Sequence, residues 1–151
     1  MKALAAVFVG AGAFALAGAP PAAPEATTKL RAELTVRQEV RKPIGTKPGA
    51  RGSFVATLTR QSTSTQLTWR LTFRNLTGPA TRAHLHLGRR GKAGPVAFGL
   101  CSPCRSGATG LLFDLRPAFV RSLLAEGVYV NVHTKKNRTG EIRGQIRKVR
   151  T

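Results

Sequence analysis

Hydrophobic and polar residues alternate in short runs along this chain, which is the pattern of half-buried β-strands. In the clearest run, 67–74, large apolar residues occupy every second position. Similar runs, separated by turn signals about every 8 to 12 residues, predict strands at 30–37, 54–59, 82–87, 95–100, 111–115, 128–133 and 141–149. We therefore expect an all-β fold, an antiparallel Greek-key-like sandwich of about 7–8 strands.

One segment departs from the strand pattern. Apolar residues recur at helical spacing at Phe119, Val120, Leu123 and Leu124. This spacing predicts one short helix near 117–125, capped by Asp114 or a residue after it and ended by Gly127. The core is expected to contain the inward-facing residues Leu67, Trp69, Leu71, Phe73, Leu85, Val130, Val132, Ile142 and Ile146.

The first 17 residues have a different character. Met1-Lys2 is followed by an uncharged, mostly apolar run that ends at Ala17, as in a secretory signal peptide. The run is shorter than the roughly 20 apolar residues of a spanning helix, and an uncleaved membrane anchor is the alternative. We expect a flexible Pro/Ala/Thr leader at 18–28, a folded domain at 29–151, a secreted (periplasmic or extracellular) protein, and no transmembrane segment in the mature chain.

The charge of the chain is strongly unbalanced. Its 151 residues include 25 Lys and Arg but 6 Asp and Glu, for a net charge of +19. Two basic loops are expected to bind anions, through Arg89, Arg90, Lys92, Lys135, Lys136 and Arg138. Anionic envelope or extracellular polymers are the expected partners, and a merely solvated basic surface is the alternative. No nucleic-acid-binding motif or stacking platform is present, so sequence-specific nucleic-acid recognition is not expected.

Histidines occur only in two of the predicted strands. His84 and His86 share one face because Ala83 and Leu85 take the other, and His133 lies opposite a row of valines in the same way. If the two strands are neighbours, the three imidazoles converge and could bind copper or zinc. Histidines that are simply solvated, or hydrogen-bonded within the sheet, are the alternative.

Three polar residues could orient these imidazoles. Tyr129 and Asn131 lie on the same strand face as His133, and Glu141 is the nearest acid in the sequence. Glu141 could instead pair with Arg143 or Arg82 at the surface. The six acids are scattered and form no pattern of paired carboxylates or of a catalytic triad, so no catalytic residue is assigned.

The two cysteines form a C-x-x-C motif. In an exported protein, Cys101 and Cys104 are expected to form a local disulfide. A thioredoxin-like redox role would require a βαβ setting that the pattern does not predict. A zinc site would require the cysteines to recruit His84 or His86.

Four segments carry a family resemblance: Ala83-His84-Leu85-His86-Leu87-Gly88, Gly94-Pro95-Val96-Ala97-Phe98, Gly127-Val128-Tyr129-Val130-Asn131-Val132-His133-Thr134 and Gly140-Glu141-Ile142-Arg143-Gly144-Gln145-Ile146. Over about 29–149 the chain resembles the chordin-type (CHRD) domain family. The resemblance implies an all-β extracellular domain without an established catalytic activity. It therefore implies a binding or structural module, with the polyanion-binding envelope protein as the alternative.

The histidine strands also resemble, more distantly, the copper-ligand strands of copper/zinc superoxide dismutase. That resemblance implies copper ligands at His84, His86 and His133, and a copper-dependent redox protein as a second alternative. The chain has no fourth histidine to bridge two metals and no Asp between Gly88 and Cys101 to complete a zinc site. The basic residues of the two loops, which the CHRD family usually lacks, would repel a metal ion and attract an anion.

Overall fold

Antiparallel strands dominate the part of the chain that the computed structural model describes, residues 25–150. The strands are β1 (Ala26–Thr35), β2 (Arg51–Arg60), β3 (Thr65–Arg74), β4 (Ala80–Leu87), β5 (Val96–Cys101), β6 (Ala108–Leu112), β7 (Val128–Thr134), β8 (Ile142–Gln145) and β9 (Arg147–Lys148). The other elements are a 3-10 turn, η1 (Val36–Gln38), and one helix, α1 (Pro117–Leu124). The all-β prediction is confirmed. At eight residues, α1 is far too short to cross a bilayer, and it is the sole α-helix within residues 25–150.

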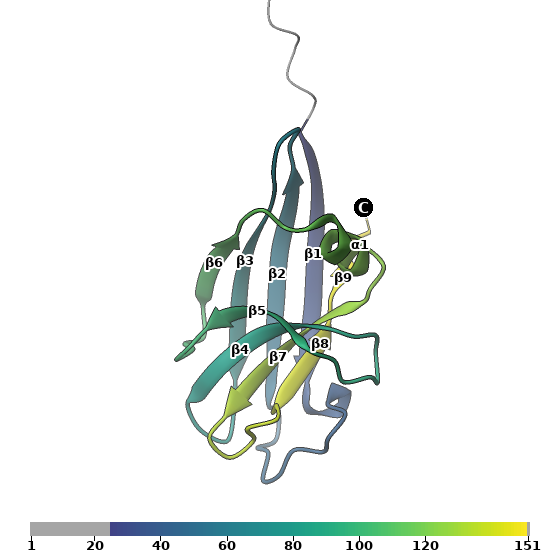
Figure 1. The fold of residues 1–151 in the computed structure, drawn as a ribbon. Coiled ribbons are helices and arrows are strands. Elements are labelled where there is room, and N and C mark those ends of the chain that lie inside the picture. The colour runs from purple at the N-terminus through teal and green to yellow at the C-terminus, as the bar shows by residue number, and fades with distance from the viewer. Residues whose placement is uncertain (1–24, 151) are drawn as a thin grey trace, which may run out of the picture.

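The strands form two layers that face each other (Figure 1). Their order is β5-β4-β7-β8-β1-β2-β3-β6, with β9 added beside β1. β5, β4, β7 and β8 form the front layer in Figure 1, and β1, β2, β3 and β6 form the back layer. β8 meets β1 at Arg143 and Thr35, which joins the two layers along one side of the sandwich.

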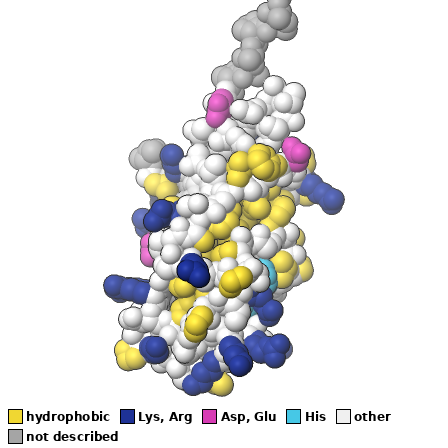
Figure 2. Space-filling view, turned by 90° about the vertical axis from the view of Figure 1, so that its left-hand side faces the viewer, with side chains coloured by type: hydrophobic (Ala, Val, Ile, Leu, Met, Phe, Trp, Pro, Cys, Tyr) yellow, Lys and Arg dark blue, Asp and Glu magenta, His cyan; other side chains and the backbone are white. Residues whose placement is uncertain are grey.

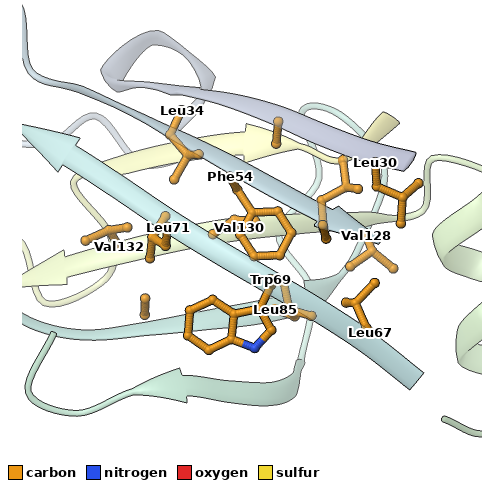
Figure 3. Packing of buried hydrophobic residues seen from close by; sticks show 14 of the residues in the cluster. Leu30, Leu34, Phe54, Leu67, Trp69, Leu71, Leu85, Val128, Val130 and Val132 are labelled. Atoms are coloured by element: carbon orange, nitrogen blue, oxygen red, sulfur yellow. The ribbon is translucent and has the colours of Figure 1, made fainter. Parts of the chain in front are cut away.

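The space between the layers is filled by the inward-facing residues of the alternating runs (Figure 3). Every predicted core residue is buried except Phe73, which is partly buried against the cluster. Trp69 and Phe54 stack with ring centroids 6.3 Å apart. Gly110 lies in register with Trp69, and a Cβ there would come within 2.5 Å of the indole, so this position on β6 accommodates only glycine. The apolar residues at every second position of the strands are therefore the residues that form the core.

The N-terminal boundary of the domain differs from the prediction. The expected signal peptide, 1–17, and the first part of the leader lie outside the described residues. β1 begins at Ala26, so residues 26–28, which we expected in the leader, pair with 58–60 of β2. The hydrogen-bonding edge of β2 extends the strand beyond the point at which the apolar alternation stops.

The C-terminal elements also differ in detail. The expected strand at 141–149 is two strands, because β8 pairs with β7 and β9 pairs with β1, on either side of the buried Ile146. The N-cap of the helix is Arg116, one of the residues after Asp114 that the prediction allowed, but no side chain caps it. Pro117 starts it, because proline fits the first helical position. Beyond its end, Glu126 takes the left-handed conformation, with φ of 56°, one residue before Gly127, at which the helix was expected to end.

Candidate metal site

The two strands that carry the histidines lie side by side. β4 pairs antiparallel with β7, which places three pairs of residues directly opposite each other: Arg82 with His133, His84 with Asn131, and His86 with Tyr129. Ala83 and Leu85 are fully buried in the core, so both histidines of β4 take the opposite face. Adjacent strands and alternation along each strand therefore bring the three imidazoles together.

This face of the sheet is partly covered by two segments of the chain. Every residue of β7 is buried, and His133 is only 4% exposed. The loop between β4 and β5 and the segment after η1 pack over it, through Gly94 and Glu39 respectively. On the side of the molecule drawn in Figure 2, histidine is visible as a small area at the right-hand edge, with Lys and Arg side chains nearby. The histidines therefore lie on the outer face of the sheet, where His84 and His86 are partly exposed and His133 is buried beneath the covering segments.

The three imidazoles face one another at short range. One ring nitrogen from each of His84, His86 and His133 lies within 4.8 Å of the others. The ring centroids are 5.0 Å apart for His84 and His133, and 5.6 Å apart for His84 and His86. Metal–nitrogen bonds of about 2.0–2.1 Å in a tetrahedral site require the nitrogens about 3.4 Å apart. Binding one ion would therefore bring the three rings closer together by side-chain rotation.

Backbone carbonyls fix the protonation of two rings. Nδ1 of His86 lies 3.0 Å from the carbonyl oxygen of Gly94, and Nδ1 of His133 lies 3.0 Å from that of Arg138. A carbonyl only accepts, so each Nδ1 carries the hydrogen and each Nε2 keeps its lone pair. Nε2 of both rings and Nδ1 of His84 are buried without a hydrogen-bond partner. Carbonyl-oriented imidazoles with free lone pairs are the usual form of metal-binding histidines.

The surroundings keep these rings neutral. The pKa of His133 is lowered to about 4, mainly by burial; the hydrogen bond to the carbonyl of Arg138 opposes this shift, and the neighbouring His84, Arg82 and His86 add to it. Burial likewise lowers the pKa of His84 and that of His86. At neutral pH all three rings are therefore neutral imidazoles, the form that binds zinc or copper. The donor set fits a soft or borderline divalent ion.

Tyr129 belongs to a stack that extends from the histidines. Its ring lies parallel to that of His86, with an 8° angle and 4.9 Å between centroids. The guanidinium carbon of Arg143 lies 3.4 Å from the centroid of the Tyr129 ring. Arg143 is only 2% exposed and donates to the carbonyl oxygens of Arg89 and Lys92 at 3.0 and 2.9 Å. The stack holds His86 from the side and ties the loop between β4 and β5 to β8.

Asn131 reaches away from the histidines. Its Nδ2 donates to Oε1 of Glu39 at 2.7 Å, while its Oδ1 is buried without a partner. Burial raises the pKa of Glu39 to about 7, against the opposing effects of Arg143 and Asn131. The contact positions the segment after η1 over β7.

Glu141 is also directed elsewhere. It is fully buried, and its carboxylate accepts hydrogen bonds from the backbone N–H and hydroxyl of Thr77, the hydroxyl of Thr134 and Nδ2 of Asn137. Thr134 follows His133 in β7, so its side chain points to the other face of the strand. Glu141 therefore braces the turn between β3 and β4 against the hairpin of β7 and β8, and it forms no surface pair with Arg143 or Arg82.

The two basic loops border the histidine cluster through their backbones. The carbonyl of Arg138 accepts from both His133 and Arg82, and the carbonyls of Arg89 and Lys92 accept from Arg143. The side chains of Arg89, Arg90, Lys92, Lys135, Lys136 and Arg138 are exposed. These loops are thus held in place by the same network that orients the imidazoles.

Cys101 and Cys104 form a disulfide at the end of β5, as predicted. The bond closes a tight loop, and the N–H of Cys104 donates to the carbonyl of Ala80 at the start of β4. The cysteines take no part in the histidine cluster.

Sequence reasoning missed Arg143, Gly94 and Glu39. Arg143 alternates with core residues, a pattern that predicts an outward-facing cation. The signal for Gly94 was available only in part: a Gly-Pro pair indicates a turn, but a Cβ at Gly94 would lie 1.6 Å from the carbonyl oxygen of Leu87, which no sequence pattern shows. Glu39 lies in a connection with no periodicity, and only the fold brings it to Asn131.

Comparison with known proteins gives one match. A family model described as the CHRD domain matches residues 30–146. No curated protein and no solved structure matches the chain.

Proposed function

The chain belongs to the CHRD domain family, and from this premise we propose that it is a secreted, non-catalytic binding module that holds one copper or zinc ion between His84, His86 and His133. The apolar segment 1–17, as a signal peptide, and the disulfide in the domain support the secreted location. Residues 29–151 would form the exported domain.

The observation that carries the proposal is that each of the three rings has a buried nitrogen without a partner, and that one nitrogen from each ring lies within 4.8 Å of the others. Each buried acceptor left unsatisfied costs about 1–3 kcal/mol. Three such costs at one point in a sheet would be relieved together by a single cation. Three imidazoles suit both zinc and copper, and the general order of affinities favours Cu²⁺ over Zn²⁺.

The rest of the network supports a site built for an ion. Gly94 and Arg138 fix the hydrogens of two rings, and Tyr129 stacks on one of them. With three protein ligands, a four-coordinate ion keeps one position for a ligand from solution. The nearby guanidinium of Arg82 favours an anion there.

Isothermal titration of Cu²⁺ and Zn²⁺ into the purified, metal-stripped protein at pH 7.5 tests the proposal. We expect one site per chain, and at least a 100-fold loss of affinity in His133→Ala and in His84→Ala/His86→Ala. Electron paramagnetic resonance of the Cu²⁺ form should show nitrogen ligands that the variants lose.

Arg89→Gln is the matched control. It changes an exposed side chain beside the site and keeps the backbone carbonyl that Arg143 uses. Its metal affinity should stay within about threefold of the wild type. Equal stoichiometry and affinity in wild type and the double-histidine variant, with both folded by circular dichroism, would refute the proposal.

A further inference from the structure

A second surface lies on the back layer, on the side of the sandwich away from the histidines. Core residues of β1, β2 and β3 point inward, so the residues between them form an exposed outer face. Strand pairing sets one row across this face: Arg147 of β9 opposite Arg31, Arg31 opposite Val55, and Val55 opposite Arg70. In Figure 2 Lys and Arg side chains project along the left-hand profile, away from the histidine.

This row places Arg147 and Arg31 directly opposite each other, with Arg70 on the far side of Val55. Like charges directly opposite on neighbouring strands destabilise a sheet. Glu33 is the single acid among the outward residues of β1, β2 and β3. Within residues 25–150 the one ion pair joins Arg147 to Glu126, at 3.5 Å, which leaves Arg31 and Arg70 without a carboxylate partner. An external anion would relieve this repulsion.

A second basic pair lies further along the same face. Arg51 and Arg74 are directly opposite each other, and both are exposed. They lie four residues from Val55 and Arg70, which is about 14 Å along the strands. One small anion cannot contact both pairs, whereas a polymer with repeated anionic groups can.

The surface between Arg31 and Arg70 is hollowed. A shallow depression of about 540 Å³ lies over Val55, which is 49% exposed. Lys29, Arg31 and Arg70 border it, and its lining also includes the hydroxyl side chains of Thr57 and Thr68. An apolar floor, hydroxyl groups and cationic walls suit the ring of a sugar that carries acidic substituents.

We propose that the outer face of β1, β2 and β3 binds an extended acidic polysaccharide, with its sulfate or carboxylate groups on Arg31 and Arg70 and, further along, on Arg51 and Arg74. Guanidinium groups bind both kinds of anion in bidentate geometry. Nucleic acid fits less well, because single-stranded binding needs aromatic platforms and Trp69 of β3 is buried at 6% exposure. The surface is separate from the metal site and does not depend on it.

The test compares two variants of equal charge. Arg31→Gln/Arg70→Gln removes two cations from the row. Arg41→Gln/Arg121→Gln removes two exposed cations, one from the loop after η1 and one from α1, and serves as the control. Binding to size-defined heparin oligosaccharides and to an oligomer of a carboxylated polysaccharide is measured by titration over a range of NaCl concentrations.

We expect the row variant to lose at least tenfold in affinity at 0.15 M NaCl and to show a salt slope lower by about two, because two fewer counterions are exchanged. The control should stay within about threefold of the wild type, and longer oligosaccharides should bind more tightly than disaccharides. The row variant should also melt at a higher temperature at low salt, since like-charge repulsion is removed.

Two results would overturn the proposal. Equal losses in the row variant and the control would show that binding follows net charge rather than this face. Double-stranded or single-stranded DNA bound as tightly as the oligosaccharides, with the same loss in the row variant, would show a general polyanion surface instead of a polysaccharide site.

Discussion

The buried carboxylate of Glu141 offers a sharp test of how this fold is held together. Its side chain is fully buried, and it accepts four hydrogen bonds from three residues, Thr77, Thr134 and Asn137. Glu141→Gln keeps the shape of the side chain but removes the charge and turns one acceptor into a donor.

The magnitude follows from the partners. The threonine hydroxyls can rotate to accept a hydrogen bond, but the backbone N–H of Thr77 and Nδ2 of Asn137 can only donate. The N–H of Thr77 and Nδ2 of Asn137 donate to different oxygens of the carboxylate. In either orientation, the NH₂ group of the glutamine amide therefore faces one of these two donors. Losing a charged hydrogen bond costs about 1.5–3 kcal/mol, and a buried unpaired donor adds about 1–3 kcal/mol. We expect a loss of about 3 kcal/mol in unfolding free energy, or roughly 10 °C in Tm.

The loss should depend on pH in a defined direction. Burial by itself would raise the pKa of Glu141, but the hydrogen bonds from Thr134, Thr77 and Asn137 outweigh it and hold that pKa below its usual value. The ionised carboxylate therefore stabilises the fold above the unfolded pKa of about 4.5, and this stabilisation disappears as pH falls through the folded pKa. The wild type and the variant should thus converge in stability in acid.

Urea unfolding at a series of pH values from 7 to 3 measures the difference. Glu33→Gln is the matched control, because it neutralises an exposed carboxylate on β1. We expect the control to change the unfolding free energy by less than about 0.5 kcal/mol. A Glu141→Gln variant within that same range at pH 7, or a difference from wild type that does not shrink in acid, would refute this account of the network.

Two further predictions concern the histidine face. Burial raises the pKa of Glu39 to about 7, so the folded state holds this proton more tightly than the unfolded chain, and stability should fall as pH rises from about 4.5 through 7. Glu39→Gln should remove that fall in stability, which is at most about 3 kcal/mol because the side chain is partly exposed. The test measures the urea midpoint of wild type and variant at pH 5 and pH 8.5. The same change in midpoint between the two pH values in both proteins would contradict the prediction. Gly94→Ala would place a Cβ 1.6 Å from the carbonyl oxygen of Leu87 and displace the carbonyl that orients His86. We expect a loss of at least 2 kcal/mol in thermal unfolding and about tenfold in metal affinity, whereas Gly99→Ala in β5, with open space at its Cβ, should change neither.

Much of the fold could be predicted because burial in a β-sandwich follows period two. The alternation around Trp69 identifies an inward face, and the same rule places His84 and His86 opposite Leu85. Strand ends were less predictable. β1 starts at Ala26 because the backbone of β2 pairs with it there. Backbone hydrogen bonding of this kind cannot be predicted from the hydrophobic pattern.

The histidine face was predictable in part for the same reason. Alternation placed Tyr129 with His133, and a stack of Tyr129 on His86 then follows from strand adjacency. The role of Glu141 was not predictable, because the chain leaves regular strand geometry at Gly140, where φ is 131°, and turns the carboxylate towards Thr134. Arg143 was expected at the surface, and it is buried because the loop between β4 and β5, distant in sequence, closes over it.

The sequence pattern was sufficient to predict the all-β class, the inward faces of the strands and the disulfide. It also predicted the residues that lie on the same strand face as the histidines. These properties depend on alternation along one strand and on contacts between near neighbours, which are local. The tertiary structure alone decided that β4 lies beside β7, that Glu39 and Gly94 close over the histidines, and that Arg31 and Arg70 fall in one row. Those contacts join residues tens of positions apart, and strand order and register arise from the packing of the whole core rather than from any single segment.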